Sequence, residues 1–210
     1  MFRSPSNVRC GTSAARGFTM IELAVTLALL GILFALGLPS FMSWVRNAQV
    51  RTAADALQSG VRRAQTDAVR LNQPVVLSFT NANPGLNAAA VANAKNWSIQ
   101  SIAQFDKDAV FLTGGALADA GSQVTITGTS NALCFNSNGR LIVPPAPGPG
   151  VPGAVCTAGP LQFDVEPTGR DPAKGDRRLR VLVAIGGQVR MCDRDRPTLS
   201  ATSPDGCPLP

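Results

Sequence analysis

The chain of 210 residues contains no histidine and no tyrosine, and aromatic residues make up only 5% of it. Histidine is the side chain that most often transfers protons at neutral pH, so the commonest general acid or base of enzymes is missing. Histidine is also a frequent zinc ligand, and the cysteines lack the C-x-x-C spacing of a thiolate site. The composition therefore argues against catalysis and against a bound metal, and we expect neither an enzyme nor a cofactor.

One pair of carboxylates keeps an enzymatic alternative open. Asp164 and Glu166 alternate along a β-prone run, and residues i and i+2 of a strand lie on the same face of a sheet. Such pairs are far more often part of a solvated sheet surface. No phosphate-binding glycine loop and no nucleophile elbow accompanies them in the sequence.

Formal charges are also absent from Leu23 to Val45, an apolar run longer than the roughly 20 residues that a helix needs to cross a membrane. The segment before it carries Arg3, Arg9 and Arg16 and no acidic residue. Under the positive-inside rule this asymmetry keeps the N-terminus in the cytoplasm and exports the remainder. The sequence therefore predicts a single membrane span.

Glu22 stands at the head of the apolar run, where an ionised carboxylate is costly and persists only with a partner or a function. Cleavage after Gly17 would supply a partner, because the new α-amine of Phe18 is a cation, on the same subunit or on another. A secretory signal cut near residues 35–37 is an alternative. Its apolar region would exceed the usual length of about 7–15 residues and would open with a glutamate. A plain single-span anchor is the second alternative.

The segment from Arg16 to Leu23 reads Arg-Gly-Phe-Thr-Met-Ile-Glu-Leu and is followed by an apolar helix with Pro39 in it. A basic leader that ends in glycine, followed by Phe-Thr-x-x-Glu, resembles the start of type IV pilins. The resemblance implies that a prepilin peptidase cleaves between Gly17 and Phe18 and that Phe18 is N-methylated. It also implies that Glu22 serves assembly with other pilins through the helix.

A single apolar seam continues beyond this run, with spacings that alternate between 4 and 3 residues from Val50 to Leu71. This repeat is typical of a helix that packs one face on a sheet, so we expect the anchor helix to extend to about Leu71. Pro39 should kink or loosen it, because proline removes one backbone hydrogen bond. The members of the seam are Val50, Ala54, Leu57, Val61, Ala64, Ala68 and Leu71.

Pro74 marks a change to short β-prone runs separated by Gly, Pro and Asn. Gly186-Gly187 is expected to form a hairpin turn between the last two runs, and residues 81–96 a surface loop. No helices are available to connect parallel strands, so the sheet should be antiparallel. The predicted strands are 75–79, 97–102, 124–126, 133–135, 161–165, 179–185 and 188–192.

Five cysteines become four if the leader is removed, because Cys10 lies in it. An even number of cysteines in an exported domain is typical of disulfides. Cys134 and Cys156 flank a stretch rich in Pro and Gly, and Cys192 and Cys207 flank a polar C-terminal tail. Of the three possible connectivities we expect the sequential one, Cys134–Cys156 and Cys192–Cys207, in which each bond closes a loop of poor intrinsic order.

The expected architecture is α+β and resembles the type IV pilin fold, with a long N-terminal helix packed on an antiparallel sheet. The four expected parts are a leader (1–17), a transmembrane and assembly helix (18–41), an amphipathic helix (42–73) and a β-rich periplasmic domain (74–210) with a disulfide-closed tail.

Residues 133–140 and 179–192 look like the corresponding stretches of minor pilins of the FimT/GspH family. This resemblance implies a minor pilin in the inner membrane that takes part in type IV pilus biogenesis, and the cysteine-framed tail is more like the pilus branch. A minor pseudopilin of the type II secretion system and a purely architectural pilus subunit are the alternatives.

Some members of this family bind DNA during natural transformation, and the resemblance points to a Gly-Arg-x-Arg element near their C-terminus. The matching stretch here is Gly-Gln-Val-Arg, so Arg190 corresponds to the second arginine and Gln188 replaces the first. A cluster of arginines around it is the pattern expected for contact with the phosphates of double-stranded DNA. The other candidate residues are Arg177, Arg178, Arg180, Arg194 and Arg196.

The competing interpretation is that acidic neighbours neutralise this cluster in surface ion pairs, which contribute about 0–1 kcal/mol each. No aromatic residue lies between Arg170 and Pro210, so bases cannot stack there and any contact would be with the DNA backbone. The acidic neighbours are Asp171, Asp176, Asp193 and Asp195.

Overall fold

The computed structural model describes residues 17–104, 106–119, 123–146, 148–196 and 203–208. The expected leader, with Cys10 and its three arginines, lies outside the described residues except for Gly17. Contacts divide the chain at Ser40 into an N-terminal unit and a C-terminal unit that begins at Phe41. Helix α1 (Met20–Leu71) contributes to both units.

Helix α1 has a defined start and a defined end. Thr19 caps its first turn, because the Glu22 amide donates a hydrogen bond to the Thr19 hydroxyl at 3.3 Å. The backbone remains helical through Pro39. Asn72 then takes a left-handed conformation with φ 48°, and the amides of Asn72 and Gln73 donate to the carbonyls of Val69 and Ala68. This is a Schellman motif, which ends the helix at Leu71, where the sequence repeat stops.

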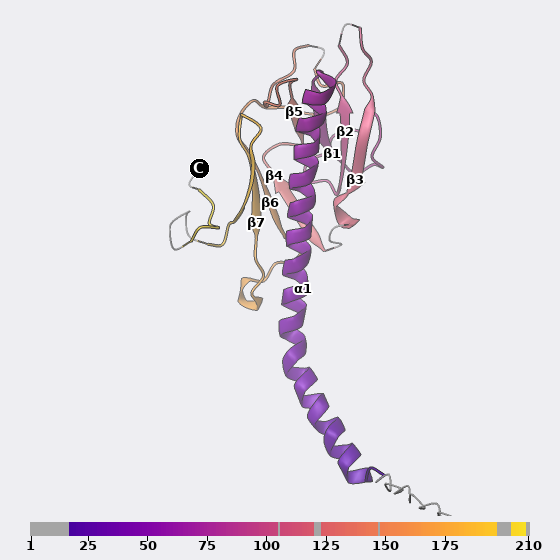
Figure 1. Cartoon of the computed structure of the whole chain (residues 1–210), viewed down its shortest axis with the longest axis vertical. Helices are drawn as coiled ribbons and strands as arrows, with labels where there is room; N and C mark the ends of the chain where they lie inside the picture. The colour runs from indigo at the N-terminus through magenta and orange to yellow at the C-terminus, as the bar shows by residue number, and fades with distance from the viewer. Residues whose placement is uncertain (1–16, 105, 120–122, 147, 197–202, 209–210) are drawn as a thin grey trace, which may run out of the picture. The chain divides into compact units, whose positions relative to one another are not determined.

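The second half of α1 buries one face, and that face is the predicted seam. Val50, Leu57 and Val61 are fully buried, whereas Leu71 at the end of the seam is only partly buried. Ala53 joins the buried face beside the predicted members. Figure 1 shows this part of the helix lying across the strands of both sheets.

The strands form two antiparallel sheets of four strands each. The first has the order β3-β2-β1-β5 and the second the order β4-β6-β7-β8. A short 3₁₀ helix, η1 (Leu117–Asp119), lies between β3 of the first sheet and β4 of the second, and another, η2 (Pro172–Lys174), lies between β6 and β7. The strands are β1 (Val75–Thr80), β2 (Asn96–Ser101), β3 (Phe111–Ala116), β4 (Val124–Gly128), β5 (Ala132–Phe135), β6 (Leu161–Pro167), β7 (Leu179–Val183) and β8 (Val189–Asp193).

Strand β3 was not among the predicted strands, because its two glycines gave no β-prone pattern. A Cβ on Gly114 would lie 2.3 Å from the Cβ of Pro84 and 2.8 Å from the carbonyl oxygen of Trp97. A Cβ on Gly115 would lie 3.1 Å from the Trp97 ring. Gly114 is therefore required by close packing against residues distant in the sequence, and Gly115 packs tightly against the same tryptophan. The expected loop at 81–96 ends one residue earlier, since Asn96 begins β2.

One hydrophobic core joins α1 to both sheets. Phe79 of β1 and Phe163 of β6 meet in it with ring centroids 5.3 Å apart. A smaller cluster on the other face of the first sheet contains Val76, Ile102 and the Cys134–Cys156 disulfide. Cys192 and Cys207 form the second disulfide. The sequential connectivity is therefore the one present, and the second bond ties the C-terminal tail to β8.

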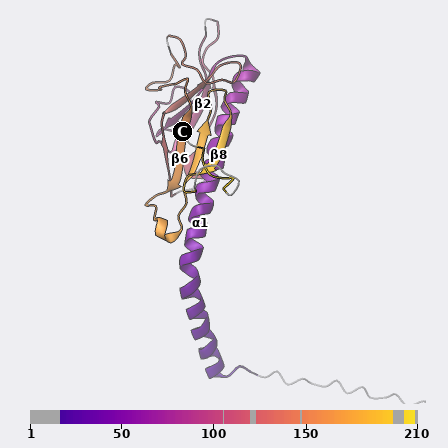
Figure 2. The ribbon, with the colours of Figure 1, turned by 90° about the vertical axis from the view of Figure 1, so that its left-hand side faces the viewer.

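The hairpin between β7 and β8 turns where the sequence predicted it. The Gly187 amide donates to the Ala184 carbonyl at 2.8 Å, and Gly187 has φ +83°. A Cβ there would lie 2.2 Å from both the Gln65 side chain and the Gly139 carbonyl oxygen, so only glycine fits. Strand β8 runs beside α1, as Figure 2 shows, and Gln58 donates to the Val189 carbonyl across this contact at 3.5 Å.

The segment 171–178, which contains η2, is fixed to α1 by polar contacts. Arg46 contacts Asp176 at 2.9 Å, and the Asn47 side chain donates to the Gly175 carbonyl and accepts from the Arg177 amide, each at 2.9 Å. The Asp176 side chain is only 2% exposed. Burial acts to raise the pKa of Asp176, but hydrogen bonds from the Asp171 amide and Arg46 outweigh it and lower the pKa below its ordinary value of 3.8.

Replacement of Arg46 by Gln should therefore lower the free energy of unfolding by about 1–3 kcal/mol at pH 7, because Asp176 stays buried without its cation. The lowered pKa stabilises the wild type fully above about pH 5, and this contribution is lost as the pH falls through the lowered pKa. The variant should thus lose less stability on acidification. Urea unfolding at pH 7 and pH 3 measures both effects.

The matched control is Arg62→Gln, since Arg62 is exposed on the same helix and has no ion pair among the described residues. Equal stability of the Arg46 variant and this control at pH 7 would show that the ion pair does not hold segment 171–178.

Candidate functional site

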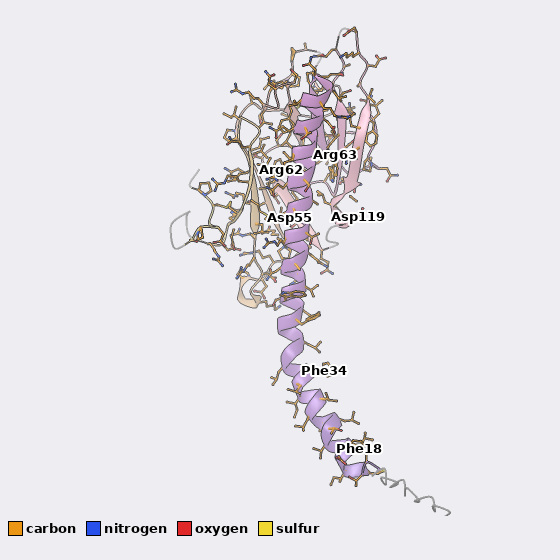
Figure 3. The ribbon with its side chains drawn as sticks, viewed as in Figure 1. Phe18, Phe34, Asp55, Arg62, Arg63 and Asp119 are labelled. Atoms are coloured by element: carbon orange, nitrogen blue, oxygen red, sulfur yellow. A yellow bond between two sulfur atoms is a disulfide. The ribbon has the colours of Figure 1, made fainter. Side chains whose placement is uncertain are left out.

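The N-terminal unit presents an apolar helix surface on every side. The large apolar side chains of residues 18–38 are all exposed, from 48% for Leu30 to 89% for Met20. Figure 3 shows Phe18 and Phe34 projecting outward from the helix. Among the described residues, α1 alone is long and apolar enough to cross a membrane. A helix that is apolar all round is stable inside a membrane or a helix bundle, so this surface requires a partner of that kind.

Glu22 is the single charged side chain between Phe18 and Val45. Its backbone amide is satisfied by Thr19, but its carboxylate forms no ion pair within the part of the chain that the structure describes. Gly17 and Phe18 precede the helix in irregular backbone. The cleavage between them, and the pairing of Glu22 with an amine, stay predictions.

The arginine cluster is organised by three aspartates. The first, Asp164 on β6, receives two hydrogen bonds from Arg180 on the neighbouring strand β7, at 2.6 and 3.0 Å. Arg194 contacts the same carboxylate. The bond to Asp164 raises the pKa of Arg180 and keeps the guanidinium charged. Two arginines therefore hold Asp164.

The second aspartate, Asp195, is bound by two arginines from other segments. Arg178 donates to it three times, from Nε at 3.0 Å and from Nη2 and the backbone amide at 2.8 Å. Arg170 adds a fourth contact at 2.8 Å. Burial acts to raise the pKa of Asp195, but the hydrogen bonds from Arg178 and Arg170 outweigh it, and the pKa is lowered.

The third aspartate, Asp193 at the end of β8, is buried beside Arg196 at 3.6 Å and Arg177 at 4.0 Å. Arg196 also contacts Asp205 in the C-terminal tail at 3.1 Å. The Asp193 amide donates to the Asp205 carbonyl at 2.7 Å. These contacts, together with the Cys192–Cys207 disulfide, fasten the tail to β8.

Five of the six candidate DNA-binding arginines are therefore ion-paired: Arg177, Arg178, Arg180, Arg194 and Arg196. Arg190 differs from them, because it is exposed and has no ion pair among the described residues. It lies opposite Leu182 on β7, two pairs along the ladder from Arg180. Only this arginine is available to a phosphate without breaking an existing ion pair.

Of the four aspartates expected to neutralise the cluster, Asp193 and Asp195 contact its arginines. Asp176 contacts Arg46 on α1 instead, and Asp171 contacts Lys174. Asp164 was assigned no such role, although it holds two of the arginines. Its role depends on the register between β6 and β7, which no local sequence signal specifies.

Both units of the chain are similar in sequence to known proteins. Residues 53–187 match the family described as type II transport protein GspH, and residues 12–38 match the prokaryotic N-terminal methylation motif. A fimbrial protein of Moraxella nonliquefaciens is 40% identical over 52 residues, which are 23% of this chain and 34% of that protein. The chain thus matches about a third of the length of that relative.

Two solved structures are similar to this chain. The type IV minor pilin FimU of Pseudomonas aeruginosa aligns with 75% of this chain and 94% of its own, at 17% identity and a TM-score of 0.45. The minor pseudopilin EpsH from the type 2 secretion system of Vibrio cholerae aligns with 71% of this chain and 99% of its own, at 11% identity and a TM-score of 0.45.

The family match covers more than half of the chain and is joined at the N-terminus by the methylation motif. The chain therefore belongs to the GspH family, the FimT/GspH-type minor pilins and pseudopilins of the type IV pilin class.

Proposed function

We propose that this protein is an architectural minor subunit of a type IV pilus. It is anchored in the inner membrane through residues 18–41 before assembly, and the same helix holds it in the filament. The observation that carries this proposal is the N-terminal unit, an exposed helix that is apolar all round and bears one carboxylate without an ion pair among the described residues.

Processing would create a partner for Glu22. The methylation motif supports cleavage by a prepilin peptidase between Gly17 and Phe18 and methylation of the new amine. Cleavage also removes the arginines of the leader, so that the Phe18 amine becomes the nearest cation to the apolar helix. In a bundle of such helices Glu22 of one subunit would meet the Phe18 amine of another. An unpaired carboxylate in that bundle would cost several kcal/mol.

We also propose that the C-terminal unit is exported to the periplasm. The basic leader favours a cytoplasmic N-terminus and places the residues beyond the membrane span in the periplasm. Two disulfides, Cys134–Cys156 and Cys192–Cys207, fit that oxidising compartment.

Two observations support a pilus over a secretion pseudopilus. The relative with 40% identity over 52 residues is a fimbrial protein. The C-terminal tail is framed by a disulfide, Cys192–Cys207, as the pilus branch of the resemblance implies. A minor pseudopilin of the type II secretion system is the alternative, and incorporation into one filament or the other separates the two.

Contact with double-stranded DNA is a second candidate function, and Arg190 is the observation that favours it. Arg190 occupies the position of the second arginine of the family's DNA-binding element, and its guanidinium is exposed without an ion pair in the described part of the chain. The ion-paired state of the other five arginines favours the architectural role. Any binding would be sequence-independent and would weaken steeply with salt.

Glu22→Ala should leave leader removal intact and reduce incorporation into sheared filaments more than tenfold, because each 1.4 kcal/mol is worth about a factor of ten. Immunoblots of cells and of sheared filaments measure processing and incorporation separately. Gly17→Glu serves as the comparison, since it should block processing and leave the longer precursor on the gel. Wild-type incorporation of the Glu22 variant would refute the assembly role of this carboxylate.

Arg190→Gln tests DNA contact. If the protein binds DNA, the variant should lose binding to duplex DNA at low salt, while Lys107→Gln should bind as the wild type does. Lys107 is exposed in the loop between β2 and β3, on the other sheet. Fluorescence anisotropy with full-length protein in detergent at two salt concentrations measures the effect. Absence of wild-type binding at low salt would refute DNA contact, and the architectural role would be the one that remains.

A further inference from the structure

A pocket of about 420 Å³ lies in the C-terminal unit between α1, the ends of β7 and β8, and the C-terminal tail. Helix α1 contributes Trp44, Asn47 and Arg51 to its wall, β8 contributes Met191, and Arg177 enters from the segment 171–178. The pocket therefore combines two guanidinium groups with an aromatic ring and an apolar side chain. Nothing in the proposed assembly or in DNA contact uses it.

The carboxylates at this pocket are already engaged. Asp193 is buried, accepts a hydrogen bond from the Asp195 amide at 2.9 Å and contacts Arg196 at 3.6 Å. Asp205 contacts the same arginine at 3.1 Å. The acidic groups of the wall thus have a cation of their own, and Arg196 is not among the residues that line the pocket.

The two arginines at the pocket are held less firmly: Arg51 has no ion pair among the described residues, and Arg177 would exchange its long contact with Asp193 for the anion. Arg51 is exposed and has no carboxylate within ion-pair distance among the described residues. Arg177 has a side chain that is 60% exposed, and its contact with Asp193 is long, at 4.0 Å. A guanidinium binds phosphate with two parallel hydrogen bonds, so this pair suits a phosphate group.

Trp44 is an exposed aromatic residue at the edge of the pocket. It is 66% exposed, and its ring centroid is 6.0 Å from that of Phe41, which is also exposed. Tryptophan is enriched at the boundary between hydrocarbon and headgroups. The uncharged run from Leu23 ends at Val45, and at about 1.5 Å per residue it spans about 34 Å, slightly more than a hydrocarbon core of about 30 Å. In the proposed anchoring, Trp44 and Arg46 therefore fall at the headgroup layer.

The fold brings Arg177 to this level from a distant part of the sequence. Asn47, one residue beyond Arg46, accepts a hydrogen bond from the Arg177 amide at 2.9 Å. The Arg46–Asp176 ion pair fixes the neighbouring residue of the same segment. The segment 171–178 is thus held against the turn of α1 that contains Arg46 and Asn47, directly after the apolar run.

We propose that this pocket binds the headgroup of an anionic phospholipid. The phosphate accepts hydrogen bonds from Arg51 and Arg177, and the glycerol backbone packs against Trp44 and Met191. The site rests on the proposed membrane anchoring of α1, because only that anchoring places the pocket at the headgroup layer. A bound lipid would fix the orientation of the C-terminal unit on the membrane before the subunit enters a filament.

The test uses full-length protein reconstituted into nanodiscs that contain equal amounts of phosphatidylglycerol and phosphatidylcholine. Native mass spectrometry of the released protein then counts the lipids that remain bound. The wild type should retain phosphatidylglycerol in at least fivefold preference, and the double variant Arg51→Gln/Arg177→Gln should lose this preference. The matched control is Arg62→Gln/Arg140→Gln, which removes two exposed arginines outside the pocket and should keep the preference.

Three results would overturn the proposal. The first is equal retention of the two lipids by the wild type, and the second is an equal loss of preference in the control. The third is displacement of the lipid by millimolar inorganic phosphate, which would assign the pocket to a free anion. Failure of the wild type to enter nanodiscs of phosphatidylcholine alone would instead contradict the membrane anchoring, so the two failures are distinguishable.

Discussion

The C-terminal unit depends on the packing of one face of α1 against both sheets. The described strands form two separate hydrogen-bonded sheets, and their buried side chains meet in one core together with the helix. Small residues on the helix, among them Ala53, Ala64 and Ala68, allow the strands to approach closely. Loss of this face would leave each sheet with an unpaired apolar surface, so the helix is part of the core rather than an appendage to it.

The same helix meets a different requirement in its first half, where every side is apolar and exposed. One continuous element therefore changes from an all-round apolar surface to a one-sided one between residues 41 and 50. The Arg46–Asp176 ion pair and the pocket beside Trp44 both lie in this interval. A filament subunit needs such a transition, because its helix must leave a lipid or protein environment and enter a solvated domain.

Several predictions that rest on local sequence patterns are confirmed by the structure. The alternation of 4 and 3 from Val50 predicted the buried face, and Gly187 predicted the hairpin. Apart from the two disulfides, the features that depend on long-range contacts were not predicted. Strand β3 was missed because Gly114 is fixed by close packing against Pro84 and Trp97. The contact between Asp164 and Arg180 follows from the register between β6 and β7.

Most arginines of the C-terminal cluster are held in ion pairs. Sequence alone shows eight basic residues between 170 and 196, which suggests a surface for polyanions. In the fold, most of this charge holds β6, β7, β8 and the tail together through Asp164, Asp193 and Asp195. The disulfide at the end of β8 closes a 15-residue separation and adds a constraint of about 3 kcal/mol. The main role of the cluster is thus to hold these strands and the tail together.

The central claim is that the leader is removed while the apolar helix is kept, so that Phe18 becomes the N-terminus beside Glu22. Mass spectrometry of the N-terminal peptide, from protein isolated out of sheared filaments, tests it most directly. The account predicts a peptide that begins with N-methylated Phe18. A chain that still begins at Met1, or one cut near residues 35–37 as a secretory signal would be, would contradict it.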